Sequence, residues 1–241
     1  MGILELWENA KGNLQFLFAC LVIIAAIFIV SIAAEKYVIK TGYKKRFVTR
    51  NIAIIGMFSA IAFILMLFEI PLGFAPSFFK IDLSEVPILI GSFALGPVAG
   101  VMLELCKILL KLVVNGTTTA FVGELANFVV GCSFVIPASI VYHVKKSRKT
   151  AIIGLATGGA VMTVFGSAFN AIYLLPKFAE LYGIPLDNII AMGTAVNSNI
   201  TSVTTMVLFA VVPFNILKAV LVSIITLILY KRISPLLKGS N

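Results

Sequence analysis

The length and composition of the chain define its broad class. It has 241 residues, of which 60% are hydrophobic and 12% are charged, whereas a soluble domain is about 45–50% apolar and about 25% charged. These values predict an integral membrane protein and argue against a soluble enzyme, a disordered chain, a nucleic-acid-binding protein and a disulfide scaffold. A helical crossing takes about 20 residues, so the chain has room for several spans but not for two large bundles.

The net charge of +9 indicates membrane orientation rather than binding to nucleic acid. Basic residues concentrate within residues 36–50, 145–149 and 231–238, and each cluster adjoins a long apolar run. Most acidic residues fall in the segments left for the opposite side. By the positive-inside rule the clusters face the cytoplasm, which predicts a multi-pass protein with its N-terminus outside and its C-terminus inside.

The first predicted span covers residues 14–34. Its basic cluster follows the apolar core, and the core is longer than the hydrophobic region of a signal peptide, so we expect a retained helix. Residues 1–45 would then be an extra transmembrane helix with a basic linker. A second span, over residues 51–68, begins the main membrane domain, which we place at residues 46–241.

An outer loop and a short helix are predicted next. Residues 72–85 contain turn formers together with Lys80, Asp82 and Ser84, a composition too polar to be embedded unless the loop covers something. The apolar run 86–95 would rise about 15 Å as a helix, half of a hydrocarbon core. It is either a short span deep in a bundle or one arm of a helix pair joined by Gly96-Pro97 below the membrane midplane.

The rest of the chain completes a body of six helices. We expect an outer loop with one short amphipathic helix over residues 177–199, and a kink in the last span at Pro213. The remaining predicted spans are residues 98–114, 120–142, 150–175 and 204–230. The predicted fold is thus an all-α integral membrane protein, a six-helix bundle preceded by one extra N-terminal transmembrane helix.

The sequence lacks the motifs of common enzyme classes. It has no P-loop and no nucleophile elbow, and its single histidine, His143, has no neighbouring cysteine or carboxylate pair to complete a zinc site. The three cysteines are far apart inside apolar runs, as small membrane-buried residues are. We therefore expect no catalytic activity, no metal and no resident cofactor.

Polar residues inside spans mark a candidate binding site, because ionisable groups in a membrane tend to face a cavity or a partner. Asn215 and Lys218 are three residues apart, share a helix face and can reach one edge of a ligand that completes their bonding. The alternative for Lys218 is a lysine that extends to the outer interface.

Two further asparagines, Asn170 and Asn127, are expected at a similar depth. They either bond between helices or join Asn215, Lys218 and the 80–85 loop around one outward-opening pocket. Deeper in the bundle, Glu104 and Lys107 lie at positions i and i+3, which predicts a buried, mutually compensating pair.

A stripe of small residues marks a possible helix–helix contact. Ala53, Gly56 and Ala60 lie on one side of the second span. Small residues let helix backbones approach closely in lipid, so the stripe either packs inside the bundle or receives another membrane protein.

Several segments resemble the riboflavin-specific substrate-binding (S) components of energy-coupling-factor (ECF) transporters, roughly over residues 46–237. The Lys-x-Asp-x-Ser-acidic-x-Pro loop from Lys80 is similar to a motif of several S components, and the Pro-Phe-Asn-x-x-Lys segment ending at Lys218 is the one that points to riboflavin. Further matching segments are residues 59–63, 96–100 with Lys107, 126–131 and 174–176 after Asn170.

The resemblance implies a function in vitamin uptake at a bacterial cell membrane. Asn215, Lys218 and Asn170 would contact the isoalloxazine ring, and the 80–85 loop would close over it. The small-residue stripe would face a membrane coupling protein that works with two cytoplasmic ATPases. Apolar side chains such as Phe79 and Leu174 would line the ring faces, alongside Phe74.

Two features depart from the family pattern, namely the helix at residues 14–34 and the long 177–204 stretch. Two other functions stay open at this point. The same fold could bind a different vitamin, or the chain could be a channel or scaffold that binds no small molecule.

Overall fold

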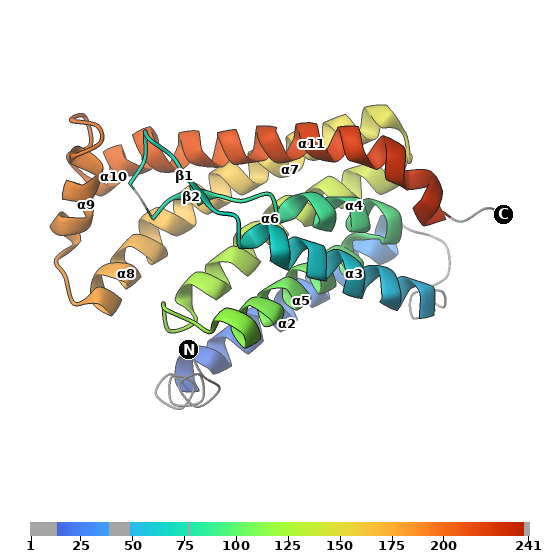
Figure 1. Cartoon of the computed structure of the whole chain (residues 1–241), viewed down its shortest axis with the longest axis horizontal. Helices are drawn as coiled ribbons and strands as arrows, with labels where there is room; N and C mark the ends of the chain where they lie inside the picture. The colour runs from blue at the N-terminus through green and yellow to red at the C-terminus, as the bar shows by residue number, and fades with distance from the viewer. Residues whose placement is uncertain (1–13, 39–48, 77, 239–241) are drawn as a thin grey trace.

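The computed structural model describes residues 14–38, 49–76 and 78–238 and is an elongated bundle of helices (Figure 1). The basic linker at residues 39–48 lies outside the described residues. The long helices are α2 (Leu14–Val38), α3 (Thr49–Met66), α5 (Pro97–Asn115), α6 (Val122–Val144), α7 (Arg148–Phe169) and α11 (Val212–Lys238). The shorter elements are β1 (Ile70–Pro71), β2 (Lys80–Ile81), α4 (Glu85–Leu95), η2 (Asn170–Leu174), α8 (Leu175–Tyr182), α9 (Leu186–Thr194), α10 (Val203–Met206) and η3 (Val207–Val211).

The predicted spans are present as helices. Five segments among the described residues are long and apolar enough to cross a membrane: Leu14–Val38, Thr49–Met66, Val122–Val144, Arg148–Tyr182 and Val203–Ile233. The two other predicted spans are α4, which is short and apolar, and α5, which carries buried charges. The bundle thus has the all-α membrane architecture that the sequence predicts.

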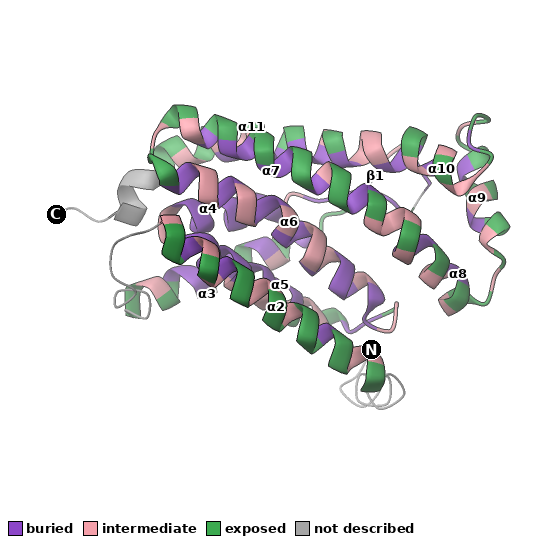
Figure 2. Ribbon diagram, turned by 180° about the vertical axis from the view of Figure 1, so that it is seen from behind, coloured by how far each residue is buried: buried purple, intermediate pink, exposed green. Residues whose placement is uncertain are grey.

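The two ends of the bundle differ. The α6–α7 connection and the C-terminal part of α11, which carry basic clusters, lie at one end, whereas α8, α9 and α10 lie at the other (Figure 1). Exposed apolar residues cover the outward faces of α2, α7 and α11, where a bilayer would contact them (Figure 2).

The α4–α5 pair reverses direction at Gly96. This residue has φ of +115°, in the left-handed region that favours glycine, and Pro97 occupies the first turn of α5, where its missing N–H costs nothing. Nearly all of α4 is buried. The short apolar run is therefore an internal helix that turns back inside the bundle.

Helices α6 and α7 pack closely because glycines of α7 face the backbone of α6. A Cβ atom on Gly154 would lie 2.5 Å from the carbonyl oxygen of Ala138, and one on Gly158 would meet the carbonyl oxygen of Phe134. In lipid, where apolar burial does not drive association, such glycines permit the close packing that holds helices together.

The segment after Asn170 differs from the prediction of a span ending at Pro176 and a loop with one short helix. The helix continues through the π-helical turn η2 into α8, and α9 follows after a short break. Pro176 lies in the first turn of α8, where proline is tolerated. The last span has a similar arrangement: α10 continues through the π-helical turn η3 into α11, and Pro213 is the second residue of α11.

The extra helix α2 packs against α5 and α6. Ile24, Ile27 and Phe28 contact an apolar cluster that includes residues of both helices. At the other end of α2, the carboxylate of Glu35 accepts a hydrogen bond of 3.1 Å from the N–H of Val98 in the first turn of α5. The helix is thus attached to the bundle by apolar packing and by a buried polar contact.

Candidate functional site

Lys218 of α11 reaches the loop that precedes α4. Its Nζ lies 3.1 Å from Oδ2 of Asp82 and 3.5 Å from Oε1 of Glu85. The side chain is buried, so it does not extend to the membrane interface. Because two carboxylates already compensate its charge, no ligand is needed for that purpose. That a ligand completes its bonding stays a prediction.

Lys107 of α5 forms a second centre next to the first. Its Nζ lies 2.7 Å from Oε2 of Glu104, 3.2 Å from Oε2 of Glu85 and 3.3 Å from Oγ of Ser84. The predicted pairing of Glu104 with Lys107 is confirmed. Lys107 is only 1% exposed and Glu104 0%, so removing Lys107 would leave Glu104 buried without this ammonium partner.

Glu85 connects the two lysines. Its carboxylate contacts Lys107 through both oxygens and Lys218 through Oε1. Three carboxylates and two ammonium groups therefore form one buried network that joins the outer loop, α4, α5 and α11. We call it the charge cluster: Asp82, Glu85, Glu104, Lys107 and Lys218.

Asp82 is the member of the charge cluster that lies in the loop. Burial by itself raises the pKa of Asp82, but the positive charges of Lys218 and Lys107 and the hydrogen bonds from Ser84 outweigh burial, so this pKa lies below its ordinary value. One of those hydrogen bonds runs 2.8 Å from the N–H of Ser84 to Oδ1 of Asp82. The loop is therefore fixed over the bundle with Asp82 ionised.

Asn215 lies one turn before Lys218 and is buried. Its Nδ2 donates to Oγ of Ser167 in α7 over 3.4 Å, a long hydrogen bond. Gly166 faces the same amide, since a Cβ atom there would lie 3.2 Å from Nδ2 of Asn215. Asn170, one turn further along, donates over 2.8 Å to the carbonyl oxygen of Gly166.

The apolar candidates fall into two groups. Phe79 is buried and its ring lies 5.3 Å from that of Phe214, the residue before Asn215. Leu174 packs with Ala126 at the start of α6, next to the half-buried Asn127. The structure thus packs Phe79 against Phe214, which is adjacent in sequence to Asn215, and it places Leu174 in a separate apolar cluster with Ala126.

Lys80 lies apart from the charge cluster. Its Nζ pairs with Oε2 of Glu69 at 2.8 Å, and both side chains are exposed. Glu69 directly precedes β1 and Lys80 begins β2, and the register of the two strands places Pro71 opposite Lys80. Its contact fixes the base of the outer loop, and it makes no contact with Lys218.

The small-residue stripe lies on the surface of α3. Ala53, Gly56 and Ala60 are all exposed, and no atom lies within 4 Å of a Cβ atom built on Gly56. Of the two possibilities left open by the sequence, packing inside the bundle does not apply. The attached helix α2 contacts α5 and α6 and leaves the stripe exposed.

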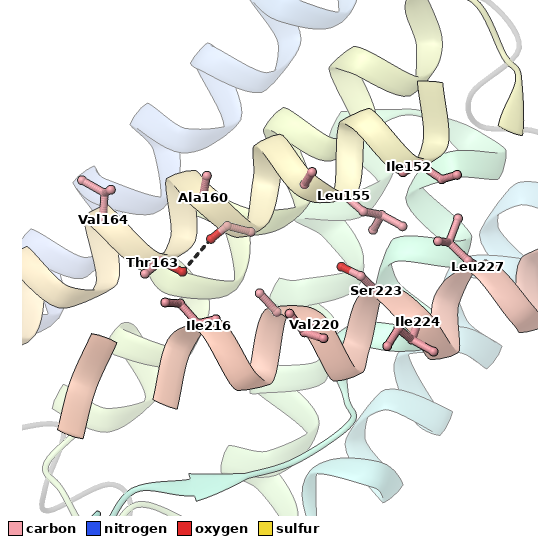
Figure 3. Close-up of a pocket in the computed structure, with 13 residues that line it drawn as sticks. Ile152, Leu155, Ala160, Thr163, Val164, Ile216, Val220, Ser223, Ile224 and Leu227 are labelled. Carbon is pink, nitrogen blue, oxygen red and sulfur yellow. Dashed lines mark hydrogen bonds between the residues drawn. The ribbon is translucent and has the colours of Figure 1, made fainter. Parts of the chain in front are cut away.

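A groove of about 560 Å³ lies between α7 and α11, and its lining differs from the polar site around Lys218 (Figure 3). Most of its lining is apolar, with Thr163 and Ser223 as polar exceptions, and Thr163 donates to the carbonyl of Gly159 in its own helix. Exposed residues such as Val220 surround it. Its composition fits contact with lipid tails and offers no set of polar groups that could orient a ligand.

Sequence reasoning singled out Asn215, Lys218 and the 80–85 loop but gave no role to Lys107 in that site. The i, i+3 spacing of Glu104 and Lys107 was the available signal. It predicts a pair within one helix and contains no information about the contacts of Lys107 with Glu85 and Ser84.

Comparison with known proteins gives a consistent result. The family model "ECF transporter, substrate-specific component" matches residues 50–230. The chain is 36% identical over 189 residues to "Riboflavin transporter RibU" of Staphylococcus aureus (strain TCH60), a match that covers 78% of this chain and 93% of that protein. It is 29% identical over 187 residues to "Riboflavin transporter FmnP" of Bacillus subtilis (strain 168), covering 77% and 93%.

A solved structure described as "Structure and mechanism of the S component of a bacterial ECF transporter" matches with a TM-score of 0.61 and 35% identity. The match covers 78% of this chain and 98% of the other. Helix α2 lies before the residues that the family model matches. From residue 50 onward, the chain belongs to the family of substrate-specific components of ECF transporters.

Proposed function

We propose that this protein is the S component for riboflavin uptake and that it binds the vitamin at the end of the bundle that carries the outer loop. The observation that carries the proposal is the extended similarity to proteins named riboflavin transporters. It is supported by the position of Asn215 and Lys218 on one buried face of α11 beneath that loop.

The chemistry of the candidate residues fits a flavin. One edge of the isoalloxazine ring alternates donors and acceptors, and the amide of Asn215 offers both. The ammonium of Lys218 donates a charge-assisted hydrogen bond to a ring carbonyl. Asn170 would extend the same polar edge, and the half-buried Asn127 of α6 would contact another part of the vitamin.

The ring faces need apolar contacts, and the loop supplies a cover. Phe79 would pack on one face and Leu174 would close the far side. Asp82 and Ser84 fix the loop to the bundle, and Lys80 fixes its base. Lys218 would contact the vitamin through a donor that its contacts with Asp82 and Glu85 leave free.

The partners that we propose are a membrane coupling protein and two cytoplasmic ATPases. The exposed stripe of Ala53, Gly56 and Ala60 is a surface on which another helix could lie closely, because it lacks large side chains. The N-terminus would lie outside and the C-terminus in the cytoplasm, in accord with the positive-inside rule. In this assembly the protein binds and releases, and it catalyses no reaction.

Ligand identity tests the proposal. The purified full-length protein should carry a yellow flavin or, after its removal, quench the fluorescence of added riboflavin in a saturable way. Thiamine, biotin and folate should produce no thermal shift. A protein that shifts with one of these vitamins and not with riboflavin would be an S component for another substrate.

A further inference from the structure

Two buried lysines share the carboxylate of Glu85, and they share it unequally. The distances from Nζ of Lys107 are 3.3 Å to Oε1 and 3.2 Å to Oε2. The distance from Nζ of Lys218 to Oε1 is 3.5 Å, the long limit of a hydrogen bond. Glu85 is thus held mainly by Lys107.

The two ammonium groups also differ in how many of their N–H donors already have an acceptor. Each has three N–H donors. Those of Lys107 are directed to Oγ of Ser84 and to both carboxylate oxygens of Glu85, and its ammonium group also pairs with Oε2 of Glu104 at 2.7 Å. Lys218 has Asp82 at 3.1 Å and the distant Glu85, and within the described part of the chain it has no third hydrogen-bond acceptor.

We propose that Lys107 is a positioning residue for the ligand site: by holding Glu85, it prevents that carboxylate from binding Lys218 tightly and leaves Lys218 with donors for the ligand. The inference rests on the proposed function for the identity of the ligand. It assigns different roles to the two lysines. Lys218 contacts the vitamin, and Lys107 acts on Lys218 through Glu85.

The charge cluster suggests a variant that tests this role without changing its charge balance. In the native protein three carboxylates face two ammonium groups. The double substitution E104Q/K107Q leaves two acidic groups and one ammonium group, so the excess of acidic over basic groups in the charge cluster is unchanged. In this variant Glu85 loses its main partner and should move toward Lys218.

Riboflavin binding, measured by fluorescence quenching, should respond in two steps. E104Q/K107Q should raise the dissociation constant at least tenfold. Adding E85Q removes the competing carboxylate, so E85Q/E104Q/K107Q should bind within about threefold of the native protein. A triple variant as weak as the double variant, or weaker, would show that Lys107 only supports the fold and would overturn the inference.

Variants that keep a positive charge at position 107 provide a second route. K107R keeps the charge and donors and should bind riboflavin within about threefold of the native protein. E85Q alone should bind at least as tightly as the native protein, since Lys218 gains free donors. A tenfold loss in E85Q would contradict the inference. The matched control is K111Q, because Lys111 pairs with Glu124 away from the charge cluster at 2.9 Å and its loss should leave binding unchanged.

A measurement without ligand separates this inference from the proposed function. Thermal unfolding of K218M, E85Q and K218M/E85Q gives the coupling between Lys218 and Glu85. The coupling should be larger in the E104Q/K107Q background than in the native background. Equal couplings would overturn the inference, whether or not the protein binds riboflavin. A native protein that fails to bind riboflavin would overturn the proposed function alone.

Discussion

The ammonium of Lys218 lies 3.1 Å from the carboxylate of Asp82, although 136 positions separate the two residues. This contact joins the last helix to the outer loop. It places Lys218, which we expect to bind a ligand, directly beneath the 80–85 loop, which we expect to cover that ligand. A ligand that reaches Lys218 would therefore lie next to the loop as well, because Asp82 of the loop contacts the same ammonium group.

Substitution of Asn215 tests the polar edge of the proposed site. Asn215→Ala should weaken riboflavin binding at least tenfold, about 1.4 kcal/mol, because it removes the buried amide that would supply a donor and an acceptor to the ligand. Fluorescence titration measures the change. Asn188→Ala, in the exposed part of α9, is the control and should bind as the native protein does. Equal affinity in both variants would remove Asn215 from the site.

The depressed pKa of Asp82 makes a prediction about pH. A carboxylate whose pKa is lowered on folding contributes stability that is fully present above its unfolded pKa, about 3.9, and that is lost as pH falls toward the lower folded value. The contribution of Asp82 to the thermal midpoint should therefore be constant from roughly pH 5 to 8 and decline below roughly pH 4.

Asp82→Asn provides the comparison. It should lower the thermal midpoint at neutral pH, and the difference between variant and native protein should shrink on acidification. A difference that stays the same down to roughly pH 3 would contradict an ionised Asp82 in the folded loop.

Glycines of the bundle provide a matched pair of stability variants. Gly154→Ala should destabilise the protein by about 1–3 kcal/mol, since the new methyl group would lie 2.5 Å from the carbonyl oxygen of Ala138. Gly56→Ala should leave the thermal midpoint unchanged or raise it slightly, because nothing lies within 4 Å and alanine favours a helix more than glycine does. Similar midpoints for both variants would indicate that α6 and α7 pack less closely than described.

The exposed stripe on α3 should serve assembly and not vitamin binding. Gly56→Leu adds bulk to a surface that another helix would have to approach closely. We expect the variant to bind riboflavin normally and to lose co-purification with the coupling protein and ATPases. Met57→Leu, an exposed neighbour on the same helix, should retain both. Normal assembly of Gly56→Leu would place the docking surface elsewhere.

The attachment of α2 can be tested at Glu35. Glu35→Ala removes the acceptor for the N–H of Val98 and should cost about 0.5–2 kcal/mol, the range for loss of a helix cap. Glu35→Gln keeps an acceptor oxygen and should cost less. Thermal unfolding measures both, and riboflavin affinity should not change. A stable Glu35→Ala variant would mean that apolar packing alone holds α2.

Features set by local sequence were predictable, whereas the contacts of the site were not. The spans follow from the length of apolar runs, and the Glu104–Lys107 pair follows from its i, i+3 spacing. The link between Lys218 and Asp82 depends on how distant helices pack, and no local pattern encodes it. One short helix was expected within residues 177–199, but the structure has two, α8 and α9. The continuation of the span into α8 was missed because Pro176 suggested an end, although proline fits the first turn of a helix.

The most direct test of the account is the affinity of riboflavin for the native protein and for Lys218→Ala, measured by fluorescence quenching in the same detergent. The account predicts saturable binding by the native protein and a dissociation constant at least tenfold higher for Lys218→Ala, with both proteins folded. Saturable binding of equal strength in the two proteins, or no quenching by the native protein, would contradict it.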